Sequence, residues 1–201
     1  MREPDAQEWH IQHSTDIGAL GVIVPTVDDV DRAREGAKWA RYPSDHYGAR
    51  RSAGSGQYNQ IWGINGVNYR QTINENMLVV IMIETPTGVA NAFDIASVNG
   101  VDVVITGNND LSSFSGYPQA DDRYHELVKK VHDETIRAGK IFGQAAATYA
   151  TGPYSYDARF FQNGPSNDGW QPPAPPGGRG RGGRGRGAPN PNLPPEGERE
   201  R

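Results

Sequence analysis

Apolar residues occur along this chain in short unbroken runs. Buried strands are predicted at residues 19–24, 77–83, 101–105 and 140–144, with a weaker one at 159–161. Helices are predicted from about 28 to 41 and at 69–75, 87–98 and 121–138. Continuous apolar strands that alternate with helices are typical of a parallel sheet, so the sequence predicts an α/β fold. The pattern does not separate an open doubly wound sheet from a closed barrel, but both gather functional groups at the C-terminal ends of their strands.

The composition changes sharply near Trp170. Residues 171–201 contain eight of the 15 prolines and eight of the 25 glycines, and Leu193 is their only large aliphatic side chain. Such a segment cannot bury enough apolar surface to offset the entropy lost on ordering. We therefore expect one folded domain at 1–170 and a disordered tail at 171–201. The tail has a net charge of +3, so the acidic excess of the chain, −4 overall, lies in the domain.

The remaining composition limits the class of protein. The chain has 201 residues and no cysteine, which suits one domain and excludes disulfides and thiolate catalysis. Its longest apolar run, 77–83, is far too short to cross a membrane, and the N-terminus has no apolar stretch of the signal-peptide kind. We expect a cytoplasmic protein without membrane contact.

Two carboxylates follow consecutive predicted strands. Glu84 comes directly after the strand at 77–83, and Asp110 comes shortly after the strand at 101–105. Neighbouring parallel strands lie about 4.8 Å apart, so both side chains could reach one ion. Carboxylate oxygens suit Mg²⁺ or Mn²⁺. A second interpretation stays open, in which Glu84 caps the following helix and Asp110 caps a turn before Leu111.

Several segments carry a resemblance to a known family. They are 16–25, 41–43, 83–85 with Asn91, and above all 100–112. Their order and spacing resemble the HpcH/HpaI aldolase/citrate lyase family, specifically its pyruvate-dependent class II aldolases, from Arg2 to about Gln144. Glu84 and Asp110 match the family's metal pair in spacing, and Arg2 and Asp16 match its active-site arginine and aspartate.

The resemblance implies a (β/α)₈ TIM barrel that binds a divalent metal, commonly Mg²⁺, Mn²⁺ or Co²⁺. Glu84 and Asp110 would be the metal ligands. Arg2 would stabilise the enolate oxygen and Asp16 would support the acid–base site. Backbone amides of the segment Gly107, Asn108, Asn109 and Asp110 would bind the carboxylate of the substrate.

The implied reaction is the reversible retro-aldol cleavage of a 4-hydroxy-2-oxo acid to pyruvate and an aldehyde. Such aldolases assemble as homo-oligomers, hexamers in this family. A divalent Lewis acid and a guanidinium both suit this chemistry, because cleavage leaves negative charge next to a carbonyl.

The chain departs from the family in its first part. The family has about three strands before the active-site arginine, and its catalytic histidine lies there. Arg2 here follows Met1, so we expect an N-terminally truncated barrel with an unpaired parallel strand edge. A catalytically inactive fragment is therefore one alternative.

A second alternative comes from the tail. The run 177–187 resembles an RGG segment, which can contact RNA phosphates through arginine. No aromatic residue is interleaved with these arginines, and the acidic domain repels a polyanion. A solubilising tail is the favoured interpretation, and nucleic acid is not an expected partner.

Overall fold

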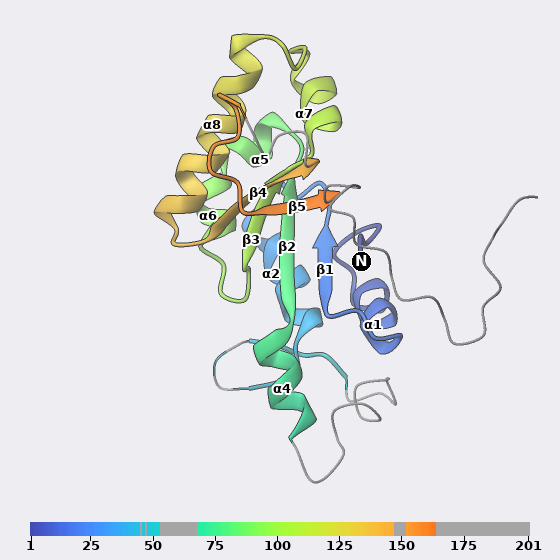
Figure 1. Cartoon of the computed structure of the whole chain (residues 1–201). Helices are drawn as coiled ribbons and strands as arrows, with labels where there is room; N and C mark the ends of the chain where they lie inside the picture. The colour runs from blue at the N-terminus through green and yellow to red at the C-terminus, as the bar shows by residue number, and fades with distance from the viewer. Residues whose placement is uncertain (45, 47, 53–67, 147–151, 164–201) are drawn as a thin grey trace, which may run out of the picture. The chain divides into compact units, whose positions relative to one another are not determined.

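The computed structural model describes residues 1–44, 46, 48–52, 68–146 and 152–163 (Figure 1). In chain order the elements are α1 Glu8–Asp16, β1 Gly21–Val24, α2 Val30–Ala40, α4 Tyr69–Asn76, β2 Leu78–Ile83, α5 Pro86–Ala90, α6 Ala92–Ala96, β3 Val103–Thr106, α7 Asn108–Ser115, α8 Asp122–Arg137, β4 Ile141–Ala146 and β5 Phe160–Asn163. The predicted domain boundary near Trp170 and the tail at 171–201 lie outside the described residues.

All five predicted strands are present and form one parallel sheet. Their order in the sheet is β1-β2-β3-β4-β5, the same as in the chain. A doubly wound sheet reverses its strand order at a switch point, whereas a barrel adds each strand beside the last. The sheet also curls from β1 towards β5 (Figure 1). The α/β prediction is confirmed, and the described residues form a curled half-barrel.

The two faces of the sheet bury different apolar sets, because successive side chains of a strand point to opposite faces. Val22 and Val24 of β1 join the main core with apolar residues of α1, α2, α6 and α8. The other face carries a smaller cluster of Ile23, Val80, Met82, Val103 and Ile105. The helices thus cover the outer face of the half-barrel, and the second cluster lines its concave side.

The edge of β1 is partly paired, which corrects the expectation of a bare edge there. Arg2 forms a parallel bridge with Ile23. The Ile23 amide donates to the Met1 carbonyl at 2.8 Å, and the Glu3 amide donates to the Ile23 carbonyl at 2.9 Å. The first residues of the chain therefore act as a short extra strand, which fixes Arg2 beside the sheet.

Two helical predictions need correction. The helix predicted at 87–98 is two short helices, α5 and α6, separated at Asn91. The segment after β3, where no helix is predicted and the alternative interpretation places a turn at Asp110, is the eight-residue helix α7, which Gly116 ends with a φ of 72°. Within the described residues, no helix is long and apolar enough to cross a membrane.

The N-terminal ends of β2 and β3 are joined by a buried arginine. Arg41 follows α2 and is only 2% exposed. Its guanidinium pairs with Asp102 at 2.7 Å and donates to the carbonyls of Gly100 and Met77 at 2.5 and 2.7 Å. The motif at 41–43 thus has a structural role, since this arginine closes the end of the sheet opposite the strand C-termini.

Substituting Arg41→Met should lower the free energy of unfolding by about 3 kcal/mol, since it removes the counter-charge of Asp102 and the guanidinium donor to the Gly100 and Met77 carbonyls. The exposed Arg34→Met on the preceding helix is the matched control, and its effect should stay within about 0.5 kcal/mol. Urea denaturation followed by circular dichroism measures both. Equal losses in the two variants would contradict this role.

Candidate functional site at the strand C-termini

Three neighbouring strands deliver polar groups to one edge of the sheet. Thr26 follows β1, Glu84 follows β2 and Gly107 follows β3. The register pairs Val24 with Ile81 and Ile83 with Thr106, so the three strands end close together. We call Arg2, Thr26, Glu84, Gly107 and Asp110 the strand-end site.

The Glu84 carboxylate is the centre of this site, and its residue is only 1% exposed. Its Oε2 atom accepts two hydrogen bonds from Thr26, one from the backbone amide and one from the hydroxyl, both at 2.8 Å. Thr26 has a φ of 51°, a left-handed conformation that is strained for a β-branched residue. Strain of this kind gathers at functional sites, and here it turns both donors of Thr26 towards one oxygen.

Gly107 closes the other side of Glu84. A Cβ atom at position 107 would lie 2.3 Å from Oε1 of Glu84 and 2.8 Å from its carboxyl carbon. Any side chain larger than hydrogen would therefore displace the carboxylate. Glycine is required here because the backbone approaches Glu84 closely.

The second carboxylate comes from the first turn of α7. Asp110 is exposed there, and its carboxyl group is close enough to act on the pKa of Glu84. Burial raises the pKa of Glu84 above its ordinary value, the two bonds from Thr26 oppose this, and Asp110 raises it further. Two like charges at one point favour either a shared proton or a cation.

Arg2 is the cationic member of the site. Its Nη2 atom lies 3.8 Å from Oε1 of Glu84, and its side chain is 48% exposed. This distance is an ion pair and not a hydrogen bond. The guanidinium therefore keeps free donors that face solvent.

The motif residues Thr85 and Asn91 have structural roles beside the site. Thr85 caps α5 by accepting from the Gly88 amide at 3.1 Å, and its hydroxyl also bonds to Asp28. Asn91 donates to the Asp28 carbonyl at 2.7 Å. These bonds fix the loop that carries Thr26 onto the end of β2. They also exclude the capping interpretation of Glu84, because Thr85 is the cap.

The structure does not bring Asp16 into this site. Asp16 ends α1 and precedes β1, so it lies where the strand begins, whereas Glu84 follows the C-terminal end of β2 (Figure 1). Its carboxylate pairs with the buried Arg51, which also donates to the hydroxyls of Thr15 and Tyr42. Its acid–base role stays a prediction.

The predicted substrate-binding residues lie beside the two carboxylates. Gly107 precedes α7 and Asn108 begins it, and the side-chain Nδ2 of Asn108 donates to Oε1 of the buried Gln144 of β4 at 3.4 Å. Gln144 in turn donates to the Tyr154 carbonyl at 2.9 Å. Asn109 is exposed and accepts from Gln119 at 2.9 Å. Gln144 thus extends the polar row along the same sheet edge.

Sequence reasoning overlooked Thr26 and Gln144. Thr26 lies 58 residues before Glu84, and nothing in its neighbours along the chain signals the contact. Gln144 has one usable signal: it is a polar residue at the end of an apolar strand run, the same pattern that identifies Glu84.

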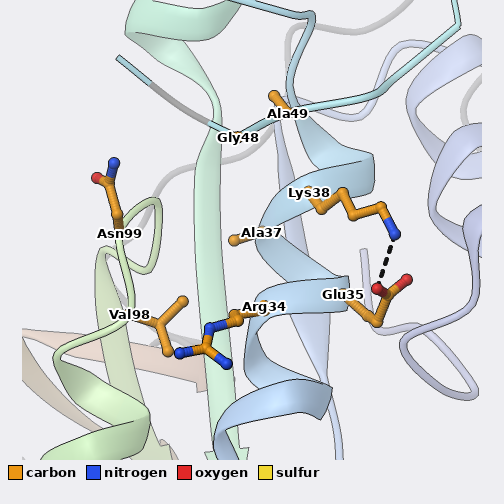
Figure 2. A pocket seen from close by; sticks show the side chains of 8 residues that line it. All are labelled: Arg34, Glu35, Ala37, Lys38, Gly48, Ala49, Val98 and Asn99. Carbon is orange, nitrogen blue, oxygen red and sulfur yellow. Dashed lines mark hydrogen bonds and ion pairs between the residues drawn. The ribbon is translucent and has the colours of Figure 1, made fainter. Parts of the chain in front are cut away.

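A separate hollow of about 330 Å³ lies beside α2, which lines it together with Gly48, Ala49, Val98 and Asn99 (Figure 2). Val98 and Asn99, which line it, precede β3, so it lies towards the N-terminal end of the sheet. Its charged groups include Lys38 and Glu35, which neutralise each other at 2.7 Å. It shares no residue with the strand-end site.

The donor set of the strand-end site fits a hard divalent cation. Mg²⁺ and Mn²⁺ bind through one or two carboxylates and keep open positions for water or substrate oxygens. Among the described residues, no group of three or more histidine, cysteine, aspartate or glutamate side chains could hold a metal. A site built on Glu84 and Asp110 would therefore leave most of the coordination shell to water and substrate.

The chain is similar to known proteins. The chain is 34% identical over 153 residues to 2-keto-3-deoxy-L-rhamnonate aldolases of Shigella sonnei and Escherichia coli, a match that covers 76% of this chain and 55% of theirs. The chain therefore spans about half the length of these curated relatives.

Solved structures show the same fold. An HpcH/HpaI aldolase from Desulfitobacterium hafniense matches 80% of this chain and 62% of its own, with a TM-score of 0.69 and 28% identity. A family protein from Burkholderia cenocepacia gives a TM-score of 0.70 at 24% identity, covering 80% and 64% of the two chains, and supports the fold alone. The model of the HpcH/HpaI aldolase/citrate lyase family matches residues 3–164. Because this match spans most of the length of the chain, the chain belongs to this family.

Proposed function

We propose that this protein is a divalent-metal-dependent carbon–carbon lyase that cleaves a 4-hydroxy-2-oxo acid reversibly to pyruvate and an aldehyde. One observation supports this function above all: Glu84 and Asp110 follow the C-terminal ends of two adjacent parallel strands, and Asp110 raises the pKa of Glu84. The names of the relatives indicate that a 2-keto-3-deoxy sugar acid is the first substrate to test.

Glu84 and Asp110 would hold the cation, for which Mg²⁺, Mn²⁺ and Co²⁺ are the candidates. A bound divalent cation supplies a Lewis acid that stabilises negative charge on the 2-oxo oxygen. Glu84 suits the ligand role because Thr26 and Gly107 fix its position, and Asp110 suits it because it is open to solvent.

The other groups of the site would orient the substrate. Arg2 has free donors beside Glu84 and would stabilise the same developing charge through hydrogen bonds. The first amides of α7, at Asn108 and Asn109, have no acceptor within the helix, so they would bind the substrate carboxylate.

The histidines of this chain lie on other elements. His10 and His13 are on α1, His125 and His132 are on α8, and His46 is bonded through its carbonyl to Asn99. The strand-end site would thus stabilise charge and orient the substrate, and cleavage would also need a base that takes the 4-hydroxyl proton.

Assembly into a homo-oligomer and a cytoplasmic location, both expected from the sequence, belong to the same proposal.

Pyruvate release from 2-keto-3-deoxy sugar acids, followed by a coupled lactate dehydrogenase assay, tests the proposal. We expect release with Mn²⁺ and its loss in EDTA. Glu84→Gln and Asp110→Asn should each lower kcat/KM by at least about 100-fold, the effect typical of removing one electrostatic stabiliser.

Glu75→Gln is the matched control, because Glu75 is an exposed glutamate on α4 whose carboxylate accepts from Gln71, away from the strand-end site. It should keep the parental rate. Release that persists in EDTA would overturn the metal-dependent mechanism. Mn²⁺ binding without any release would favour the inactive-fragment alternative.

The raised pKa of Glu84 makes stability depend on pH in the metal-free protein. The folded chain binds this proton more tightly than the unfolded chain, whose pKa is near 4.5. This contribution to stability is fully present below the unfolded pKa and is lost as the pH rises through the folded pKa. We expect Glu84→Gln, which cannot ionise, to gain stability relative to the parent as the pH rises from 4.5 towards neutrality.

Urea unfolding in EDTA at several pH values measures this difference. Added Mn²⁺ should reverse it by stabilising the parent alone. A gap between parent and variant that does not change with pH would contradict the raised pKa.

A further inference from the structure

The two oxygens of Glu84 have different surroundings. A carboxylate oxygen has two lone-pair positions, and the two Thr26 bonds at 2.8 Å occupy both of those on Oε2. Oε1 instead lies against Gly107, with the Arg2 guanidinium 3.8 Å away. Within the part of the chain that the structure describes, Oε1 is therefore the oxygen that keeps acceptor capacity for a ligand.

This difference is fixed by the surrounding backbone. Thr26 can give both bonds to one oxygen because its φ is 51°, and its loop is fixed through Asp28 to Thr85 and Asn91. On the other side, the Gly107 backbone approaches Oε1 so closely that a Cβ atom there would lie 2.3 Å from it. Glu84 therefore cannot exchange its two oxygens without breaking the contact with Thr26.

Cations differ in how they use a carboxylate. Ca²⁺ takes six to eight oxygens and often binds both oxygens of one carboxylate, whereas Mg²⁺ takes six ligands at shorter distance and keeps several waters. A glutamate that offers one oxygen suits the smaller, octahedral cation. The environment of Oε2 thus bears on which metal the site accepts.

From these contacts we infer that Thr26 is a positioning residue that makes Glu84 a one-oxygen ligand, so that the site selects Mg²⁺ and Mn²⁺ over Ca²⁺. This inference rests on the proposed function, because it assigns a role at the same metal site. Thr26 touches neither metal nor substrate and acts through Oε2 of Glu84. Its hydroxyl is the decisive group, since the backbone amide is common to every residue at this position.

The test measures metal affinity and needs no turnover. MnCl₂ is titrated into the full 201-residue chain, free Mn²⁺ is read by its electron paramagnetic resonance signal, and CaCl₂ competition gives the affinity for Ca²⁺. Thr26→Val removes the hydroxyl with almost no change in shape. Thr26→Ser keeps the hydroxyl and is the matched control, and circular dichroism melting checks that each variant folds.

We expect Thr26→Val to weaken Mn²⁺ binding by roughly 10- to 100-fold, as is typical when a partner of a metal ligand is removed. In the Thr26→Val chain, the ratio of the affinity for Mn²⁺ to that for Ca²⁺ should fall by about tenfold or more, because one lone-pair position of Oε2 becomes available to a cation. Thr26→Ser should keep both values within about twofold. Should the valine variant fail to fold, Thr26→Ala against Thr26→Ser makes the same comparison.

Two results would overturn this inference but leave the proposed function in place. One is a Thr26→Val chain that keeps the parental affinity and preference while Glu84→Gln abolishes Mn²⁺ binding. The other is a serine variant as impaired as the valine variant, which would show that packing and not the hydroxyl matters. A parental chain that binds no Mn²⁺ would instead overturn the proposed metal site itself.

Discussion

The burial of one carboxylate, that of Glu84, is the constraint on which the site depends. A buried carboxylate is unfavourable unless donors or a cation compensate its charge. Thr26 donates to one oxygen, Arg2 lies 3.8 Å from the other, and a second acid, Asp110, raises the pKa of the group. The end of β2 therefore holds more negative charge than the surrounding protein neutralises, which is the condition under which a divalent cation binds.

The residues that stabilise the sheet and those of the strand-end site lie at opposite ends of the strands. Arg41 and Asp102 join the ends where β2 and β3 begin, and Arg51 binds Asp16 where β1 begins. The opposite ends are free to carry Glu84 and Asp110. Because the strands follow one another in chain order, the loop after β1 lies directly beside the end of β2. Because these two segments are adjacent, Thr26 can bond to Glu84 although the two residues are 58 positions apart in the sequence.

Much of the fold could be predicted from the sequence, because parallel strands buried on both faces appear as unbroken apolar runs. Helix α7 could not, since Asn108–Ser115 has little apolar periodicity and begins with two asparagines. The places of Glu84 and Asp110 after strands single them out in the sequence. The cap that Thr85 forms on α5 excludes the capping alternative for Glu84, and the ligand role of both residues stays a prediction. The partners of Glu84 and Asp16 depend on long-range contacts with Thr26 and Arg51, which no local pattern encodes.

The most direct measurement is a crystal structure of the chain grown with Mn²⁺, with anomalous diffraction recorded at a wavelength where manganese scatters. The account predicts one strong anomalous peak bonded to Oε1 of Glu84 and to the Asp110 carboxylate, with Oε2 of Glu84 still bound to Thr26. A peak elsewhere, or carboxylates that point apart with no peak between them, would contradict it.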